Sequence, residues 1–152
     1  MKQIMGIFSI TMLWASLSWA ETTVIVDTPF VQEYHEAYPL TGSSNNVKAI
    51  TVDAQDRVWV ATQVGVSYLE GKTWKACTGL SEGPTFGIAS NKEGVWVASW
   101  DGVYQVRDGQ AKKISGIDAP ISVIDANDDT VVALGPDGGW RMSKGQWSSL
   151  DG

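Results

Sequence analysis

The chain has 152 residues and carries 17 acidic against 11 basic side chains, a formal net charge of −6. This length allows one ordinary domain, and the acidic balance disfavours nucleic acid, whose phosphates are bound through Lys and Arg. One cysteine and one histidine exclude an intrachain disulfide and any site built from several histidines.

Residues 1–20 are predicted to form a cleavable signal peptide. A Lys near the start precedes an apolar run from Ile4 to Leu17, and small residues flank Trp19 just before the predicted cleavage point. The alternative is a membrane anchor, but this run is about 14 residues long and a spanning helix needs roughly 20. We therefore expect a periplasmic or secreted mature chain with no membrane insertion.

Residues 21–46 precede the first repeat, yet their end is similar to the end of a repeat. Residues 34–47 parallel residues 74–86 in the spacing of their aromatic and apolar positions. We expect a lone outer strand at residues 30–34, which is how an N-terminal strand completes the last sheet of a ring.

Three similar segments follow, at residues 47–83, 84–119 and 120–152, and each repeats after about 37 residues. Short β-branched or aromatic runs alternate with Gly, Asn and Asp turns, which is typical of strands in hairpins. In the first segment we expect strands at 48–52, 58–62, 66–69 and 73–77. The equivalent positions across the segments are Trp59, Trp96 and Val132, and then Gly65, Gly102 and Gly138.

Four short strands in each of three consecutive units predict an all-β fold, a β-propeller fragment of three blades plus the N-terminal closing strand. Propellers have four to eight blades, so three do not close a ring. Two completions stay open, namely further blades in cis and blades from another chain. Truncation is favoured over assembly, because an open array exposes strand edges and an apolar blade face.

The repeats resemble the two-component-regulator propeller family, whose unit reads approximately V-x-x-I-x-x-D-x-x-G-x-L-W-V-G-T-x-x-G-L. The chain has AITVDAQDRVWVATQVGV and GIASNKEGVWVASWDGV, and the match fades in the third repeat. The turn glycine survives only as Gly94 and is Asp56 in the first unit, a residue type that tolerates the left-handed conformation. The resemblance implies a bacterial extracytoplasmic ligand-sensing propeller.

The strand positions that recur between the repeats are expected to be structural. The two repeat tryptophans lie between valines in mid-strand, and both faces of a blade are covered by neighbouring blades. The predicted core positions are Trp59, Val60, Gly65, Trp96, Val97 and Gly102.

No catalytic residue, cofactor or metal site is predicted. The acidic residues gather in turns, where Asp is common, and the run at 125–130 lacks the Gly and Glu of a calcium loop. Cys77 has no second Cys or His nearby and is expected to be a buried or half-buried structural thiol, and His35 a solvent-facing turn residue.

One face of the blades is the predicted ligand site, because the loop between strands two and three and the loop into the next blade emerge on the same side. Trp100 follows Ser99 at a turn, and an exposed indole is suited to stacking on a sugar. Its alternative role is to fill the gap between blades. The predicted ligand residues are Asn45, Asn46, Gln63, Thr85, Trp100, Asp101 and Asp137.

The resemblance and the absence of a catalytic constellation favour a non-catalytic segment that recognises a small molecule or a glycan for two-component-type signalling. Two alternatives stay open. One is a polysaccharide lyase or hydrolase with its catalytic residues in further blades, and the other is a scaffold for protein partners.

Overall fold

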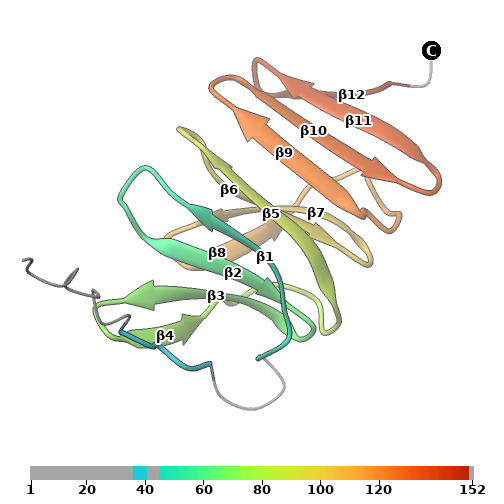
Figure 1. Ribbon diagram of the computed structural model, residues 1–152. Helices are drawn as coiled ribbons and strands as arrows, with labels where there is room; N and C mark the ends of the chain where they lie inside the picture. The colour runs from blue at the N-terminus through green and yellow to red at the C-terminus, as the bar shows by residue number, and fades with distance from the viewer. Residues whose placement is uncertain (1–35, 41–44, 151–152) are drawn as a thin grey trace, which may run out of the picture. The chain divides into compact units, whose positions relative to one another are not determined.

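The computed structural model describes residues 36–40 and 45–150. The predicted signal peptide at 1–20, the predicted outer strand at 30–34 and His35 lie outside this part of the chain. Its regular structure consists of three antiparallel four-stranded sheets, each built from consecutive strands (Figure 1). The all-β propeller prediction is therefore confirmed at the level of the fold, and we refer to the sheets as blades 1, 2 and 3.

Each blade is a meander of short strands joined by tight turns. Blade 1 contains β1 (Val47–Val52), β2 (Val58–Thr62), β3 (Gly65–Glu70) and β4 (Thr73–Ala76). Blade 2 contains β5 (Thr85–Asn91), β6 (Gly94–Ser99), β7 (Gly102–Arg107) and β8 (Gln110–Lys113). Blade 3 contains β9 (Val123–Asn127), β10 (Thr130–Gly135), β11 (Gly138–Ser143) and β12 (Gln146–Ser149). The observed strands of blade 1 agree with the predicted ones to within one residue.

The turn between the first two strands requires an unusual backbone conformation. Asp56 has φ of 59° in blade 1, and Gly94 has φ of 134° in the same turn of blade 2. The expectation that Asp56 replaces a glycine in the left-handed region is confirmed, since Asp adopts that region more easily than most residues.

The blades pack face against face, with the first strands β1, β5 and β9 adjacent (Figure 1). Two apolar clusters fill the spaces between them. Trp59 lies fully buried between blades 1 and 2, and Trp96 lies between blades 2 and 3. Val60 and Val97 are also buried, so the repeat tryptophans and their neighbours pack rather than face solvent.

The segment that leaves a blade runs along the outer strand of the next blade. Thr78, just after blade 1, donates its N–H to the Gly109 carbonyl at 3.0 Å and accepts from the Ala111 N–H at 2.8 Å, beside β8. Residues 36–40 have the corresponding place beside β4, where the Trp74 Nε1 donates to the Tyr38 carbonyl at 2.7 Å. The stretch before blade 1 thus packs as a departing segment does, in agreement with the sequence parallel.

Candidate ligand-binding face

The predicted ligand residues lie at one end of the blades. Val47 at the start of β1 pairs with Thr62 at the end of β2, and Thr85 at the start of β5 pairs with Ser99 at the end of β6. The turn that follows the second strand therefore lies beside the start of the first strand. We call this end the bulge face, and it comprises residues 45–48 and 63–64, 84–86 and 100–101, and 122–123 and 136–137.

The face takes its name from a β-bulge at the start of β1 and of β5. Val47 and Ala49 pair with the successive residues Thr62 and Ala61, which leaves Lys48 as an extra residue. In the same way Thr85 and Gly87 pair with Ser99 and Ala98 and leave Phe86 as the extra residue. A bulge redirects a side chain away from the regular alternation, and both Lys48 and Phe86 are exposed.

Trp100 is held firmly while part of its ring stays exposed. Its indole Nε1 donates to the Glu82 carbonyl at 3.1 Å, and its backbone N–H donates to the Pro84 carbonyl at 3.2 Å. A Cβ on Gly83 would lie 2.2 Å from the indole Nε1, so the ring packs directly on this glycine. The side chain is nevertheless 43% exposed.

Phe86 and Trp100 are the two exposed large apolar residues of blade 2 in the described part of the chain. Blade 2 has a neighbour on each side, so their exposure does not arise from an uncovered blade face. Both are aromatic, and they lie at the same end of the β5–β6 pair. Thr85 pairs with Ser99, and Phe86 directly follows Thr85 while Trp100 directly follows Ser99. We refer to these two exposed aromatic residues of the bulge face as the aromatic platform.

Thr85 has a different role from the one predicted. Its side chain is only 1% exposed. Its hydroxyl accepts the Thr62 N–H at 3.1 Å and lies 2.9 Å from the Thr62 carbonyl and 3.1 Å from the Gly65 carbonyl, to which it can donate. Thr85 therefore links blade 2 to blade 1, and its buried hydroxyl is not available to a ligand at the surface.

Asp101 is occupied by neighbours within blade 2. The Tyr104 hydroxyl donates to its Oδ2 at 2.7 Å, and the Lys113 Nζ lies 3.7 Å away. Burial raises the pKa of Asp101, but the hydrogen bond from Tyr104 and the charge of Lys113 are among the interactions that outweigh it and hold the pKa below its ordinary value. The carboxylate is thus ionised and fixes the turn that carries Trp100.

The other predicted residues are exposed polar groups. Asn45 and Asn46 precede β1, and the backbone N–H of Gln63 donates to the backbone carbonyl of Asn46 at 3.1 Å, so the backbones of Asn46 and Gln63 are adjacent on blade 1. Asp137 is exposed in the equivalent turn of blade 3, with blade 2 between it and the amides.

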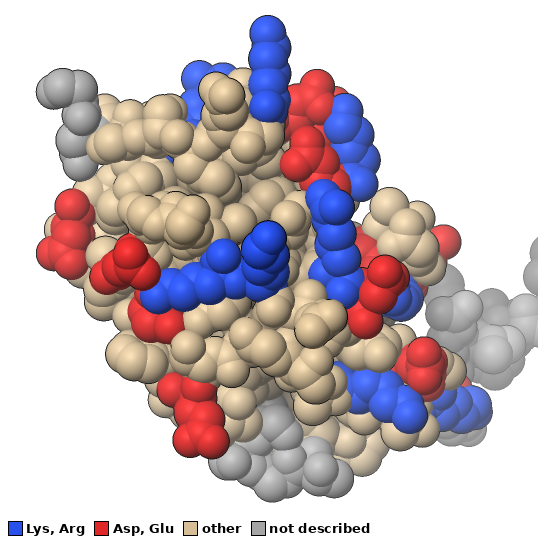
Figure 2. Space-filling view, turned by 180° about the vertical axis from the view of Figure 1, so that it is seen from behind, with Lys and Arg blue, Asp and Glu red and all other residues tan. Residues whose placement is uncertain are grey.

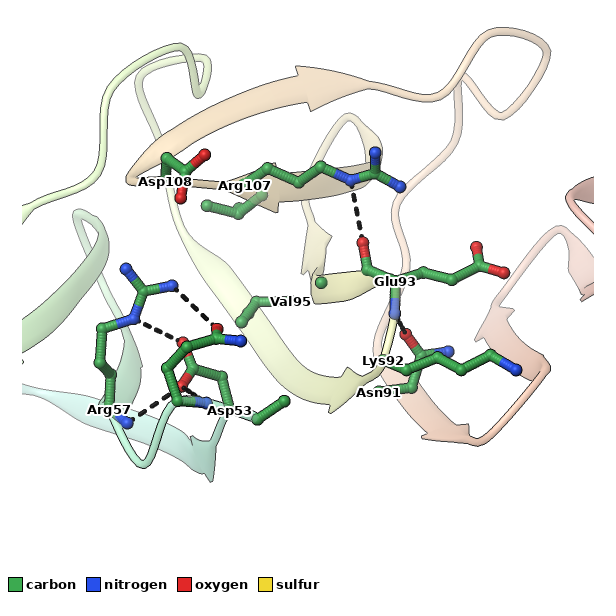
Figure 3. Close-up of a pocket in the computed structure, with 12 residues that line it drawn as sticks. Asp53, Arg57, Asn91, Lys92, Glu93, Val95, Arg107 and Asp108 are labelled. Carbon is green, nitrogen blue, oxygen red and sulfur yellow. Dashed lines mark hydrogen bonds and ion pairs between the residues drawn. The ribbon is translucent and has the colours of Figure 1, made fainter.

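A pocket that the sequence did not indicate opens at the opposite end, between blades 1 and 2 (Figure 3). Its volume is about 510 Å³, and Asp53, Arg57, Val95 and Arg107 are among its lining residues. The Arg57 Nε donates to the Asp53 Oδ2 at 2.7 Å, and the Arg107 Nε donates to the Glu93 carbonyl at 2.9 Å. Each arginine is thereby oriented, a property that no spacing in the sequence predicts.

A second pocket of about 540 Å³ lies between residues 36–40 and the β3–β4 hairpin, with Trp74 and Lys72 in its wall. None of the predicted ligand residues lines either pocket.

The described residues contain a single thiol, that of Cys77. In residues 36–40 and 45–150, no cluster of three acidic, His or Cys side chains has metal-binding geometry. Cys77 is half-buried, and burial raises its pKa to about 11, although a hydrogen bond with the Ala111 backbone opposes the shift. On the side of the molecule seen in Figure 2, acidic and basic side chains are interspersed.

Comparison with solved structures places this architecture among β-propellers. The extracellular domain of a putative hybrid two-component system from B. thetaiotaomicron matches with a TM-score of 0.53 and 15% sequence identity, over 72% of this chain and 19% of that chain. At this identity the likeness concerns the fold alone, and the chain spans about a fifth of the length of that protein.

One short segment of the chain also matches a family profile. The sequence profile described as two component regulator propeller matches residues 41–63, so the chain carries a repeat of this type and the resemblance is confirmed. The description of the profile and the name of the solved structure both refer to two-component systems. None of the curated proteins matches the chain. The part of the chain described by the structure contains no helix long and apolar enough to cross a membrane.

Proposed function

We propose that this chain is a non-catalytic, extracytoplasmic propeller segment that recognises a small molecule or a glycan at its bulge face and serves two-component-type signalling. The observation that supports this most is the aromatic platform of Phe86 and Trp100. A blade whose two faces are covered has no packing reason to expose two aromatic side chains at the same end.

The chemistry of the platform suits a ring-shaped ligand with hydroxyl groups. Aromatic faces bind the apolar face of a pyranose ring, and an indole that is already fixed loses little conformational freedom on binding. The amides of Asn45, Asn46 and Gln63 on the adjoining blade offer both donors and acceptors for hydroxyl groups.

Completion of the ring belongs to the same proposal. The departing-segment position of residues 36–40 beside β4 supports a further blade ahead of blade 1, supplied either in cis or by another chain. The bulge face then forms part of one rim of the ring.

The proposal is tested at the platform itself. Trp100→Ala and Phe86→Ala are each expected to weaken the binding of a bound sugar about ten-fold, which corresponds to about 1.4 kcal/mol. Binding is measured by saturation-transfer NMR with a set of methyl glycosides, followed by titration of those that respond.

A matched control is Val52→Ala, because Val52 is an exposed apolar residue on a blade face, away from the bulge face. It should leave the titrations unchanged. If both platform variants keep wild-type affinity while their circular dichroism spectra stay native, the site assignment is wrong. Capture of proteins with no response to any glycoside would instead favour the scaffold function.

A further inference from the structure

The same backbone position near the start of the first strand carries different chemistry in each blade. Lys48 is the extra residue of β1 and Phe86 that of β5. In blade 3 the Ser122 N–H donates to the Leu134 carbonyl at 2.8 Å, and Ser122 is exposed just before the Val123–Leu134 pair, which is the corresponding position. A cation, an aromatic ring and a hydroxyl thus follow one another along the inner strands.

A short chain of contacts links the backbone at Lys48 to the strand that carries Phe86. Its neighbour Val47 pairs with Thr62, and the Thr62 N–H donates to the hydroxyl of Thr85 at 3.1 Å. Thr85 directly precedes Phe86. The strands β1 and β5 are also in direct contact. The ammonium group of a four-carbon side chain at this position can therefore reach a ligand that rests on Phe86 and Trp100.

The charge of Lys48 is not compensated within the described part of the chain. Four other lysines form ion pairs there, namely Lys72 with Glu36, Lys75 with Glu70, Lys92 with Asp129, and Lys113 with Asp101 and Asp118. Lys48 forms none and is exposed. Of the acids at this end on blade 2, Asp101 is already bound by Tyr104 and Lys113.

We infer that the ligand carries an acidic group next to its ring and that Lys48 determines this preference. The inference rests on the proposed binding at the bulge face and adds the class of ligand, an acidic ring compound such as a uronic acid glycoside. The aromatic platform holds the ring, and the ammonium group of Lys48 binds the carboxylate.

The test uses two probes that differ only in the acidic group, methyl β-D-glucuronide and methyl β-D-glucoside. The wild-type chain is expected to bind the glucuronide about five-fold more tightly at low salt, the scale of one exposed ion pair. Added salt should reduce this preference because it screens exposed charges. Lys48→Gln should bind both probes equally, and Lys112→Gln, which removes an exposed lysine of β8, should keep the preference.

The outcomes separate this inference from the proposed function. Equal binding of the two probes by the wild type, or an unchanged preference in Lys48→Gln, would overturn the role of Lys48. If Trp100→Ala binds neither probe in that case, the platform is still supported. If neither probe binds, or if Trp100→Ala binds both as the wild type does, the proposed function fails and the inference fails with it.

Discussion

At the scale of single residues, the blades are stabilised by a side chain that joins a turn to the repeat tryptophan. The Asp53 Oδ1 accepts the N–H groups of Gln55 and Arg57, each at 2.9 Å, and its Oδ2 accepts the Trp59 Nε1 at 2.7 Å. In blade 2 the single Oδ1 of Asn91 accepts both the Glu93 N–H and the Trp96 Nε1, each at 3.0 Å. A buried indole N–H thus always has an acceptor in the blades that contain the tryptophan.

Removal of this acceptor should destabilise blade 1 strongly. Asp53→Ala leaves the Trp59 N–H and the Arg57 guanidinium without their partner in a site where Asp53 is nearly fully buried. We expect a loss of about 3 kcal/mol in the free energy of unfolding, measured by urea denaturation. Asp53→Asn keeps one acceptor oxygen, as Asn91 does, and should lose clearly less; equal losses in the two variants would contradict this account.

The same residue predicts how stability depends on pH. Burial raises the pKa of Asp53, but hydrogen bonds from the Arg57 backbone, the Trp59 indole, the Arg57 side chain and Gln55 outweigh it, so the folded pKa is below the ordinary 3.8. A lowered folded pKa contributes stability that is complete above the ordinary value and is lost as the pH falls through the folded value. Urea midpoints of the wild type should therefore fall more steeply below pH 4 than those of Asp53→Asn.

Sequence reasoning succeeds for residues whose role follows from alternation and fails where contacts cross between blades. Trp59 and Trp96 sit between valines, so a packed blade has to bury them. Thr85 gives no such sign, because its hydroxyl is used by the Thr62 and Gly65 backbone of the preceding blade. Asp53 is one of the acidic residues that the sequence places in turns, and its bond to Trp59 within the same blade depends on where the next strand returns.

At the scale of the elements, the turns after the second strand are shaped by glycine. Gly65 and Gly102 hold equivalent positions with φ of 124° and 142°, a region that side chains rarely adopt. Their surroundings differ, since a Cβ on Gly65 would meet nothing within 4 Å and a Cβ on Gly102 would lie 2.3 Å from the Ile117 carbonyl oxygen. A substitution at Gly65 therefore tests backbone conformation alone, and one at Gly102 adds a steric clash.

The two glycines form a matched pair of variants. Gly65→Ala should reduce the free energy of unfolding by about 1–2 kcal/mol through backbone strain. Gly102→Ala should lose about 2 kcal/mol more, because the Ile117 backbone cannot move without disturbing the buried Ile117 side chain. Thermal and urea unfolding of both variants would measure the difference; equal losses would mean that the segment after β8 yields freely.

Strands could be predicted from the sequence, and the bulges could not. Four runs with period two, bounded by turn residues, define a blade. A bulge adds one residue to a strand but requires no particular residue type. Lys48 and Phe86 therefore resemble ordinary strand positions until it is known that Val47 pairs with Thr62 and Thr85 with Ser99. The platform residue Phe86 was missed for this reason, whereas Trp100 stood out at a turn.

At the scale of the whole array, the two terminal blades differ from the middle one. Ile50 of blade 1 is 65% exposed and Val123 of blade 3 is 55% exposed, and Leu134 is paired with Val123 and also exposed. The equivalent positions of blade 2 are covered by its neighbours. The same apolar faces that hold blades 1, 2 and 3 together are thus available at both ends of the array.

Exposed faces of this kind should make the chain associate with itself. We expect the sedimentation coefficient to rise with protein concentration, because apolar area that is buried between copies contributes about 25 cal/mol per Å². Ile50→Lys combined with Leu134→Lys should abolish the rise, since a charge at a blade face opposes pairing in the way natural sheets protect their edges. Val64→Lys, which adds a lysine at an exposed turn of the bulge face, is the matched control and should associate as the wild type does. A wild-type chain that sediments as a monomer at every concentration would mean that these faces are covered in another way.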